Sequence, residues 1–183
     1  MLFAPAAKSD DMIHLSDFRE LVIRPALAVM ARCDSRMNSR AAELLLSGTA
    51  YAESRVGQSG LQQHPGGPAL GVFQMEARGG SSTFEWLWRD FLSTSRRHGW
   101  REHIADGCGL VVEDITADRL VDHLVFAGCL ARLRYWVVPS ALPSAEDRPA
   151  LAAYWRKFYN GNPRDEDEKI RRFLRGLELF DER

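Results

Sequence analysis

Glu53 is the acidic residue whose place in the sequence best suits acid–base chemistry. At about 100° per residue, a helix over residues 39–53 puts Glu53 on one side with the uncharged residues Ala42, Leu46, Thr49 and Ala50. We therefore expect its carboxyl group to point into the protein, where burial raises the pKa and suits the group to donate a proton. The alternative is a structural ion pair with Arg55 or a more distant arginine, and spacing alone favours that alternative.

Motifs for other kinds of catalysis do not occur in the sequence. His98 and His103 are five residues apart, so they do not share one helical face, and no His-Glu-x-x-His motif is present. Neither a Gly-x-Ser-x-Gly motif nor a phosphate-binding loop occurs. Cys33, Cys108 and Cys129 form no Cys-x-x-Cys pair, so we expect no disulfide framework, although one bridge remains open. We predict neither a bound metal nor a cofactor.

The segment that carries Glu53 is expected to be a central helix followed by a loop. Apolar residues point in all directions around a helix over 39–53, which is typical of a helix in the middle of a domain. The next segment, 57–71, contains His64-Pro65-Gly66-Gly67-Pro68, which predicts tight turns and allows a small hairpin. Residues 56–75 hold no Asp, Glu, Lys or Arg, but they are rich in Gly, Gln, Pro and Ser, so we predict a loop and no membrane span.

Further helices are expected on both sides of this pair, which makes the fold class all-α with at most a small hairpin. Caps and apolar spacing predict helices that begin near Ser16, with a break or kink at Pro25, and near Ser82. Further helices are predicted from Thr116-Ala117-Asp118 until before Pro139, from a cap in Ser144-Ala145-Glu146-Asp147 until Tyr159, and from Asn162-Pro163 until Phe180. We expect a single domain over 1–183, with a core over about 16–162 and a solvated, charged C-terminal helix over about 163–181.

The composition is that of an ordinary globular domain. The chain has 183 residues, of which 24 are Lys or Arg and 25 are Asp or Glu, and its net charge of −1 provides no field to attract nucleic acid. Most of the five tryptophans are expected in the core, although an indole can also stack on a sugar ring. The first residues place one basic side chain after a short apolar run, which is the wrong order for a secretory signal, so we expect synthesis in a bacterial cytoplasm without a signal peptide.

Three short motifs follow one another along the chain: Glu53-Ser54, Gly71-Val72-Phe73-Gln74-Met75 and Tyr159-Asn160. In this order and on the expected elements they resemble the superfamily of goose-type lysozymes and soluble lytic transglycosylases. Residues 45–50 and 66–71 look especially like small lysozyme-like proteins of tailed phages. The resemblance spans about residues 16–162 and implies a lysozyme-like fold, in which a central buried helix ends at the catalytic glutamate.

The resemblance also implies roles for the motif residues. Glu53 would protonate the glycosidic oxygen between N-acetylmuramic acid and N-acetylglucosamine, and Ser54, Gln74, Met75, Tyr159 and Asn160 would contact the substrate. The Tyr159 hydroxyl would reach toward the acid or the adjacent sugar, whereas the alternative is that it closes the core. Asn160 would orient the substrate or hold a loop, and its alternative is a helix end.

The number of carboxylates decides the expected mechanism. Most glycosidases use two, but residues 56–75 contain none, and the next acids are Glu76, Glu85 and Asp90. The resemblance therefore favours chemistry with Glu53 alone, assisted by the acetamido group of the substrate, and hydrolysis is the competing outcome. Glu76 also follows the Gln-Met pair in the phage-like proteins; we assign it no catalysis, and it could contact a residue that itself touches the sugar.

The expected function is cleavage of peptidoglycan glycan strands for a phage or prophage, in lysis or as part of a virion that opens the wall. The enzyme would reach the wall through a virion, a holin or another delivery device, and other virion proteins are possible partners. The alternative is an inactive lysozyme-like protein that serves as a structural or interaction module of a virion.

Overall fold

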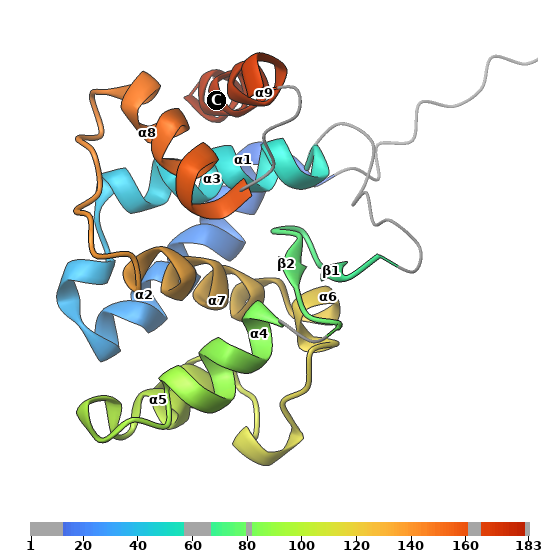
Figure 1. The fold of residues 1–183 in the computed structure, drawn as a ribbon, viewed down its shortest axis with the longest axis vertical. Coiled ribbons are helices and arrows are strands. Elements are labelled where there is room, and N and C mark those ends of the chain that lie inside the picture. Colours follow the sequence, from blue (N-terminus) through green and yellow to red (C-terminus); the bar gives the residue numbers. More distant parts are fainter. Residues whose placement is uncertain (1–12, 57–66, 80–81, 161–165, 182–183) are drawn as a thin grey trace, which may run out of the picture.

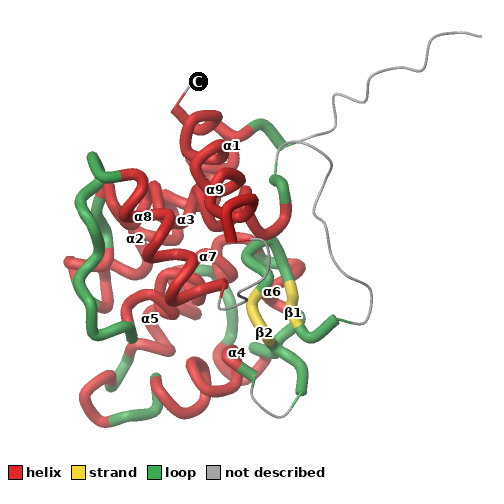
Figure 2. The backbone as a smooth tube through the Cα atoms, turned by 45° about the horizontal axis from the view of Figure 1, so that its top comes forward, coloured by secondary structure: helices red, strands yellow, loops and turns green. Residues whose placement is uncertain are grey.

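A computed structural model describes residues 13–56, 67–79, 82–160 and 166–181. These residues are mostly helical and include a two-stranded antiparallel sheet, which confirms the all-α class with a small hairpin (Figure 2). Within this part of the chain, no helix is both long enough and apolar enough to cross a membrane.

The first helical stretch runs through Pro25 without ending. It consists of α1 (Leu15–Phe18), a π-helical turn η1 (Arg19–Ile23) and α2 (Arg24–Cys33), and the residues at both junctions keep helical dihedral angles. The predicted break at Pro25 is therefore wrong, while the alternative, a kink there, stays a prediction. Because Pro25 has no N–H, it cannot donate the usual helical hydrogen bond to the preceding turn. In the wider π turn directly before Pro25, the carbonyl groups bond to other N–H groups than in an α-helix, so the helix can continue.

The central helix has the bounds that the sequence predicts. In α3 (Arg40–Ser54), the Ser39 side chain accepts a hydrogen bond from the Ala42 N–H at 3.2 Å and so caps the first turn. The helix ends at Arg55, whose φ of 53° is left-handed. Most of its residues are buried, which confirms the prediction of a helix surrounded by the protein.

The hairpin begins where the predicted loop ends. Strands β1 (Ala69–Leu70) and β2 (Met75–Glu76) are antiparallel, and a four-residue turn joins them. Gly71 opens that turn with φ +72°, and a Cβ atom there would lie 1.9 Å from the carbonyl oxygen of Leu120. Only glycine fits this position. The predicted turn residues 64–66 lie outside the described residues.

The helices after the hairpin differ in part from the prediction. Ser82 caps α4 (Thr83–Glu85), which continues as the π-helical turn η3 (Trp86–Phe91), as expected. The helix α5 (Trp100–Gly107) was not predicted. Short 3-10 turns cover Ser35–Met37, Ser95–Arg97 and Val112–Asp114.

The helix predicted from residue 116 is two helices. They are α6 (Arg119–Asp122) and α7 (Leu124–Trp136), separated at His123 by its extended backbone. The His123 Nδ1 atom accepts a hydrogen bond from the Phe126 N–H at 3.2 Å. The helix is therefore interrupted at His123, and the His123 side chain caps the first turn of α7.

The helix predicted after the capping segment 144–147 begins at the last residue of that segment. Asp147 caps α8 (Arg148–Trp155) by accepting from the Ala150 N–H at 3.0 Å, which confirms the predicted cap. A π-helical turn, η6 (Arg156–Asn160), continues α8.

The last helix, α9 (Glu166–Asp181), packs against α3 and α8 (Figure 1). Phe173, Leu177 and Phe180 are completely buried. The expectation of a solvated C-terminal helix outside a core that ends near residue 162 is therefore wrong for this face of α9. Most residues of this helix are charged, and its apolar residues form only a narrow stripe at spacings of three and four, which the composition alone does not indicate.

Candidate functional site

Glu53 lies in the last turn of α3 and lines a cavity of about 200 Å³. The cavity is formed where α3, the hairpin, α7 and η6 meet. Six residues singled out in the sequence line it together: Glu53, Gln74, Met75, Glu76, Tyr159 and Asn160. Pro68, Ala69 and Arg134 complete the wall. Motifs that are about 100 residues apart in the sequence thus share one cavity.

The Glu53 carboxyl group is half-buried and has a hydrogen-bond donor. Asn160 Nδ2 donates to Glu53 Oε1 at 3.2 Å, and the Asn160 carbonyl oxygen in turn accepts from Lys169 Nζ at 3.1 Å. Among the described residues, Glu53 makes no ion pair with an arginine or a lysine, and Arg55 is exposed beyond the helix end. The structure therefore contradicts the pair with Arg55, and Arg164 lies outside the described residues.

Burial raises the pKa of Glu53 above its ordinary value, because it removes water from the charged form. The donor from Asn160, the indole N–H of Trp155 and the charges of Lys169 and Arg134 act in the opposite direction. Trp155 Nε1 is buried without a well-formed hydrogen bond, but it lies near enough to the carboxyl group to favour its ionised form. Desolvation outweighs these groups, so Glu53 holds its proton to a higher pH than an exposed glutamate.

Tyr159 holds two elements of the site together. Its hydroxyl donates to the backbone oxygen of Phe73 in the hairpin turn at 2.8 Å, and its ring lies 5.1 Å from that of Tyr135. This hydrogen bond directs the hydroxyl to the hairpin turn, 86 residues away in the sequence, and not to Glu53. A contact of Tyr159 with the adjacent sugar stays a prediction, since Tyr159 lines the cavity. Burial raises the pKa of Tyr159 well above its ordinary value.

Ser54 does not contribute to the cavity. It is fully buried, and its hydroxyl donates to the Ala50 backbone oxygen at 2.9 Å. One residue along a helix turns the side chain by about 100°, which takes Ser54 away from the face of Glu53. Its predicted contact with substrate is therefore contradicted.

The hairpin contributes three predicted residues to the wall of the cavity. Gln74 has a left-handed φ of 46°, and its Nε2 atom donates to the Gly71 backbone oxygen at 2.7 Å. Met75 is buried at the cavity edge, while Glu76 is exposed. The turn therefore brings an amide and a carboxylate to the same cavity as Glu53.

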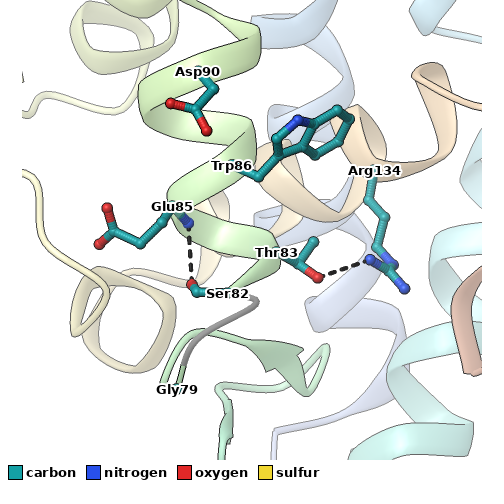
Figure 3. Close-up of a pocket in the computed structure, with 7 residues that line it drawn as sticks. All are labelled: Gly79, Ser82, Thr83, Glu85, Trp86, Asp90 and Arg134. Carbon is teal, nitrogen blue, oxygen red and sulfur yellow. Dashed lines mark hydrogen bonds between the residues drawn. The ribbon is translucent and has the colours of Figure 1, made fainter.

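Arg134 on α7 joins this cavity to a second, larger one. Its guanidinium donates to Thr83 Oγ1 at 3.0 Å and to the Tyr159 backbone oxygen at 3.1 Å. The second cavity has a volume of about 630 Å³ and is lined by Gly79, Ser82, Thr83, Glu85, Trp86, Asp90 and Arg134 (Figure 3). Figure 3 shows Trp86 and Asp90 on one helical segment, with Arg134 coming from α7. The 45% exposed Trp86 provides an aromatic surface there.

Sequence reasoning missed Arg134, Lys169 and Trp155 as site residues. For Arg134 a signal existed, because a helix as apolar as 124–136 has no solvated side on which to place its arginines. Trp155 is one of five tryptophans whose spacing does not separate core from site, and Lys169 lies among the many charged residues of the last helix.

Within the described part of the chain, no group of three or more His, Cys, Asp or Glu side chains could hold a metal ion. Comparisons of the chain with models of known protein families, with curated proteins and with solved structures found no match. The chemistry of the site must therefore be argued from its own residues.

Proposed function

We propose that this protein cleaves the glycan strands of peptidoglycan at the bond between N-acetylmuramic acid and N-acetylglucosamine, with Glu53 as the general acid. The observation that supports this best is the half-buried Glu53 carboxyl group, whose pKa is raised, in one cavity with Gln74, Met75, Tyr159 and Asn160. A raised pKa favours the protonated carboxyl group, and this form can donate the proton that a glycosidic oxygen needs in order to leave.

The second cavity supports a polymeric substrate. Because Arg134 lines both cavities, they adjoin, and a chain of sugars could extend from Glu53 toward Trp86. The indole of Trp86 could stack on the apolar face of a pyranose, while Glu85 and Asp90 could accept hydrogen bonds from hydroxyl groups. Arg134 and the amides of Gln74 and Asn160 would meet the sugar nearest the acid.

In the proposed reaction, Glu53 gives its proton to the glycosidic oxygen, the bond from that oxygen to the anomeric carbon breaks, and the leaving sugar departs as an alcohol. The acetamido oxygen of the remaining sugar bonds to the anomeric carbon. The Glu53 carboxylate then takes a proton either from the 6-hydroxyl of that sugar or from water. The oxygen that loses this proton bonds to the anomeric carbon as the bond to the acetamido oxygen breaks, which gives a 1,6-anhydro ring in the first case and a reducing end in the second. Glu76 lines the same cavity, but this route requires no second carboxylate.

The proposal includes a lysozyme-like arrangement, in which α3 is the central helix and ends at the acid. It also includes a role for a phage or prophage, with delivery to the wall through a virion or a holin. An inactive module of a virion is the alternative that the experiment must separate from this function.

The test compares purified wild-type protein with Glu53→Gln on isolated peptidoglycan, with release of soluble fragments as the measurement. We expect the variant to lose about 10²–10⁴-fold in rate, the usual contribution of a general acid. Glu76→Gln is the matched control, since it changes a second carboxylate of the same cavity and should lose much less. Mass spectrometry of the products separates anhydro ends from reducing ends.

Equal and negligible release by wild type and Glu53→Gln, on walls of several bacterial types, would contradict the proposed enzyme and favour the inactive module. An equally large loss in Glu76→Gln would instead indicate chemistry with two carboxylates.

A further inference from the structure

A lysine outside the three motifs begins a short chain of hydrogen bonds that ends on Glu53. Lys169 Nζ donates to Asn160 Oδ1 at 3.1 Å, and Asn160 Nδ2 donates to Glu53 Oε1 at 3.2 Å. Lys169 lies in the first turn of α9 and is half-buried. The positive end of the helix dipole disfavours a cation at that place, so helix stability does not explain the lysine.

The chemistry of the two side chains fixes the orientation of the amide. An ammonium group carries only donors, so the Asn160 atom that faces Lys169 must be the carbonyl oxygen. The NH₂ group of the same amide must then face Glu53. Lys169 and Glu53 therefore favour the same orientation of the amide, and without Lys169 only Glu53 would do so.

We infer that Lys169 is a positioning residue, which acts through Asn160 to keep an N–H donor on the carboxyl group of Glu53. This inference rests on the proposed role of Glu53 as the acid. Its consequence is that the carboxylate left after proton transfer is stabilised by a hydrogen bond, so that Glu53 can then accept a proton in the second half of the reaction.

Two other polar groups near Glu53 are held by partners of their own. Arg134 of α7 is bound to Thr83 and to the backbone of Tyr159, and the Tyr159 hydroxyl is bound to the hairpin turn. Polar neighbours among the described residues also include Gln74 of the hairpin turn, Glu76 of β2, Trp155 of α8 and Tyr135 of α7. On α9, the Arg172 guanidinium donates to the Ala52 backbone oxygen at 3.4 Å. Replacing Lys169 should leave these contacts in place.

The experiment titrates the ¹³C-labelled carboxyl group of Glu53 by NMR in the full-length protein without substrate. Lys169→Met should move the titration midpoint up by about one pH unit, because the carboxylate loses both a nearby cation and its fixed donor. Lys169→Arg should stay close to wild type. Arg171→Met removes a positive charge from an exposed position of the same helix and should leave the midpoint unchanged.

A double-mutant cycle with Asn160→Ala separates action through the amide from action of charge alone. If Lys169 acts through Asn160, the effect of Lys169→Met is clearly smaller in the Asn160→Ala background. Strictly additive effects, or equal shifts in Lys169→Met and Arg171→Met, would overturn the inference. Circular dichroism verifies that each variant is folded.

Activity gives an independent readout. In Lys169→Met, the high-pH limb of the rate profile on peptidoglycan should move to higher pH together with the NMR midpoint. We also expect kcat to fall about tenfold while KM changes little. If the wild type proves inactive, the proposed function fails, but the NMR cycle still decides whether Lys169 positions the amide. If the wild type is active but Lys169→Met has the same pH profile as the wild type, the positioning role of Lys169 is contradicted and the proposed function stands.

Discussion

At the scale of single residues, Glu53 combines a chemical use with a cost in stability. Burial favours the protonated form, whereas Asn160, Trp155 and two cations favour the ionised form. Desolvation is the larger effect, so the folded protein must either keep the proton or hold a poorly hydrated charge. Sites that carry out chemistry often hold groups in states that the fold alone would not select.

The pH dependence of stability follows from this raised pKa. Below the pKa of the unfolded chain both states are protonated and Glu53 costs nothing, whereas above the raised pKa of the folded state the full penalty is present. Glu53→Gln keeps an oxygen for the Asn160 donor and removes the charge, so it should be more stable than wild type at pH 8 and not at pH 3. Each kcal/mol corresponds to a rise in Tm of about 2–4 °C for a chain of this size.

Differential scanning calorimetry at the two pH values measures this effect. The matched control is Glu113→Gln, at an exposed position, which should change Tm little at either pH. A Glu53→Gln protein that is less stable than wild type at pH 8 would show that the ionised carboxylate supports the fold.

The direction of the Glu53 side chain could be predicted from the sequence, but the contacts of its neighbours could not. Helical period alone places Glu53 on the uncharged side of α3. The partner of the Tyr159 hydroxyl is a backbone oxygen 86 residues away, and Lys169 reaches Asn160 from another helix. Such contacts follow from how helices pack, which local spacing does not contain.

At the scale of elements, π-helical turns bring site residues to the cavities. η6 ends with Tyr159 and Asn160, and η3 carries Trp86 and Asp90. A π turn shifts the side chains that follow it relative to a regular helix, and such turns are frequent at functional sites. Caps and apolar spacing predicted both parent helices. They do not distinguish a π turn from an α turn, so the sequence could not show where these side chains point.

The hairpin turn depends on Gly71 for two separable reasons. Gly71→Ala must hold alanine at φ +72° and must place its Cβ atom against the Leu120 backbone, so the turn has to move. Gly109 has a similar φ of +68° with no atom within 4 Å of an added Cβ. We expect Gly109→Ala to cost about 1–2 kcal/mol and Gly71→Ala about 1–3 kcal/mol more. Urea denaturation of both variants measures the difference, and equal losses would mean that the contact with Leu120 does not matter.

At the scale of the whole molecule, α9 connects the candidate site to the opposite end of the fold. Lys169 lies at its site end, while at the other end Asp181 pairs with Arg40 and Arg148, the first residues of α3 and α8. Arg19 of the first helical stretch donates to the Phe180 backbone oxygen at 2.7 Å. The last helix therefore fixes the positions of three earlier elements, although its charged sequence suggested a solvated appendage.

The sign of one substitution tests whether this helix is part of the core. Alanine is a better helix former than glycine by about 0.5–1 kcal/mol, so Gly176→Ala would stabilise a helix that is exposed on all sides. In the packed structure, the new Cβ atom would lie 2.7 Å from the Tyr51 Cβ atom, and α9 would have to move away from α3. We therefore expect a net loss of about 1–3 kcal/mol in the free energy of unfolding, measured by urea denaturation. Hydrogen exchange should become faster in α9 and in the end of α3 that carries Glu53, because the two helices protect each other. A gain in stability would mean that α9 does not rest on α3, and Lys169 would then have no fixed position from which to orient Asn160.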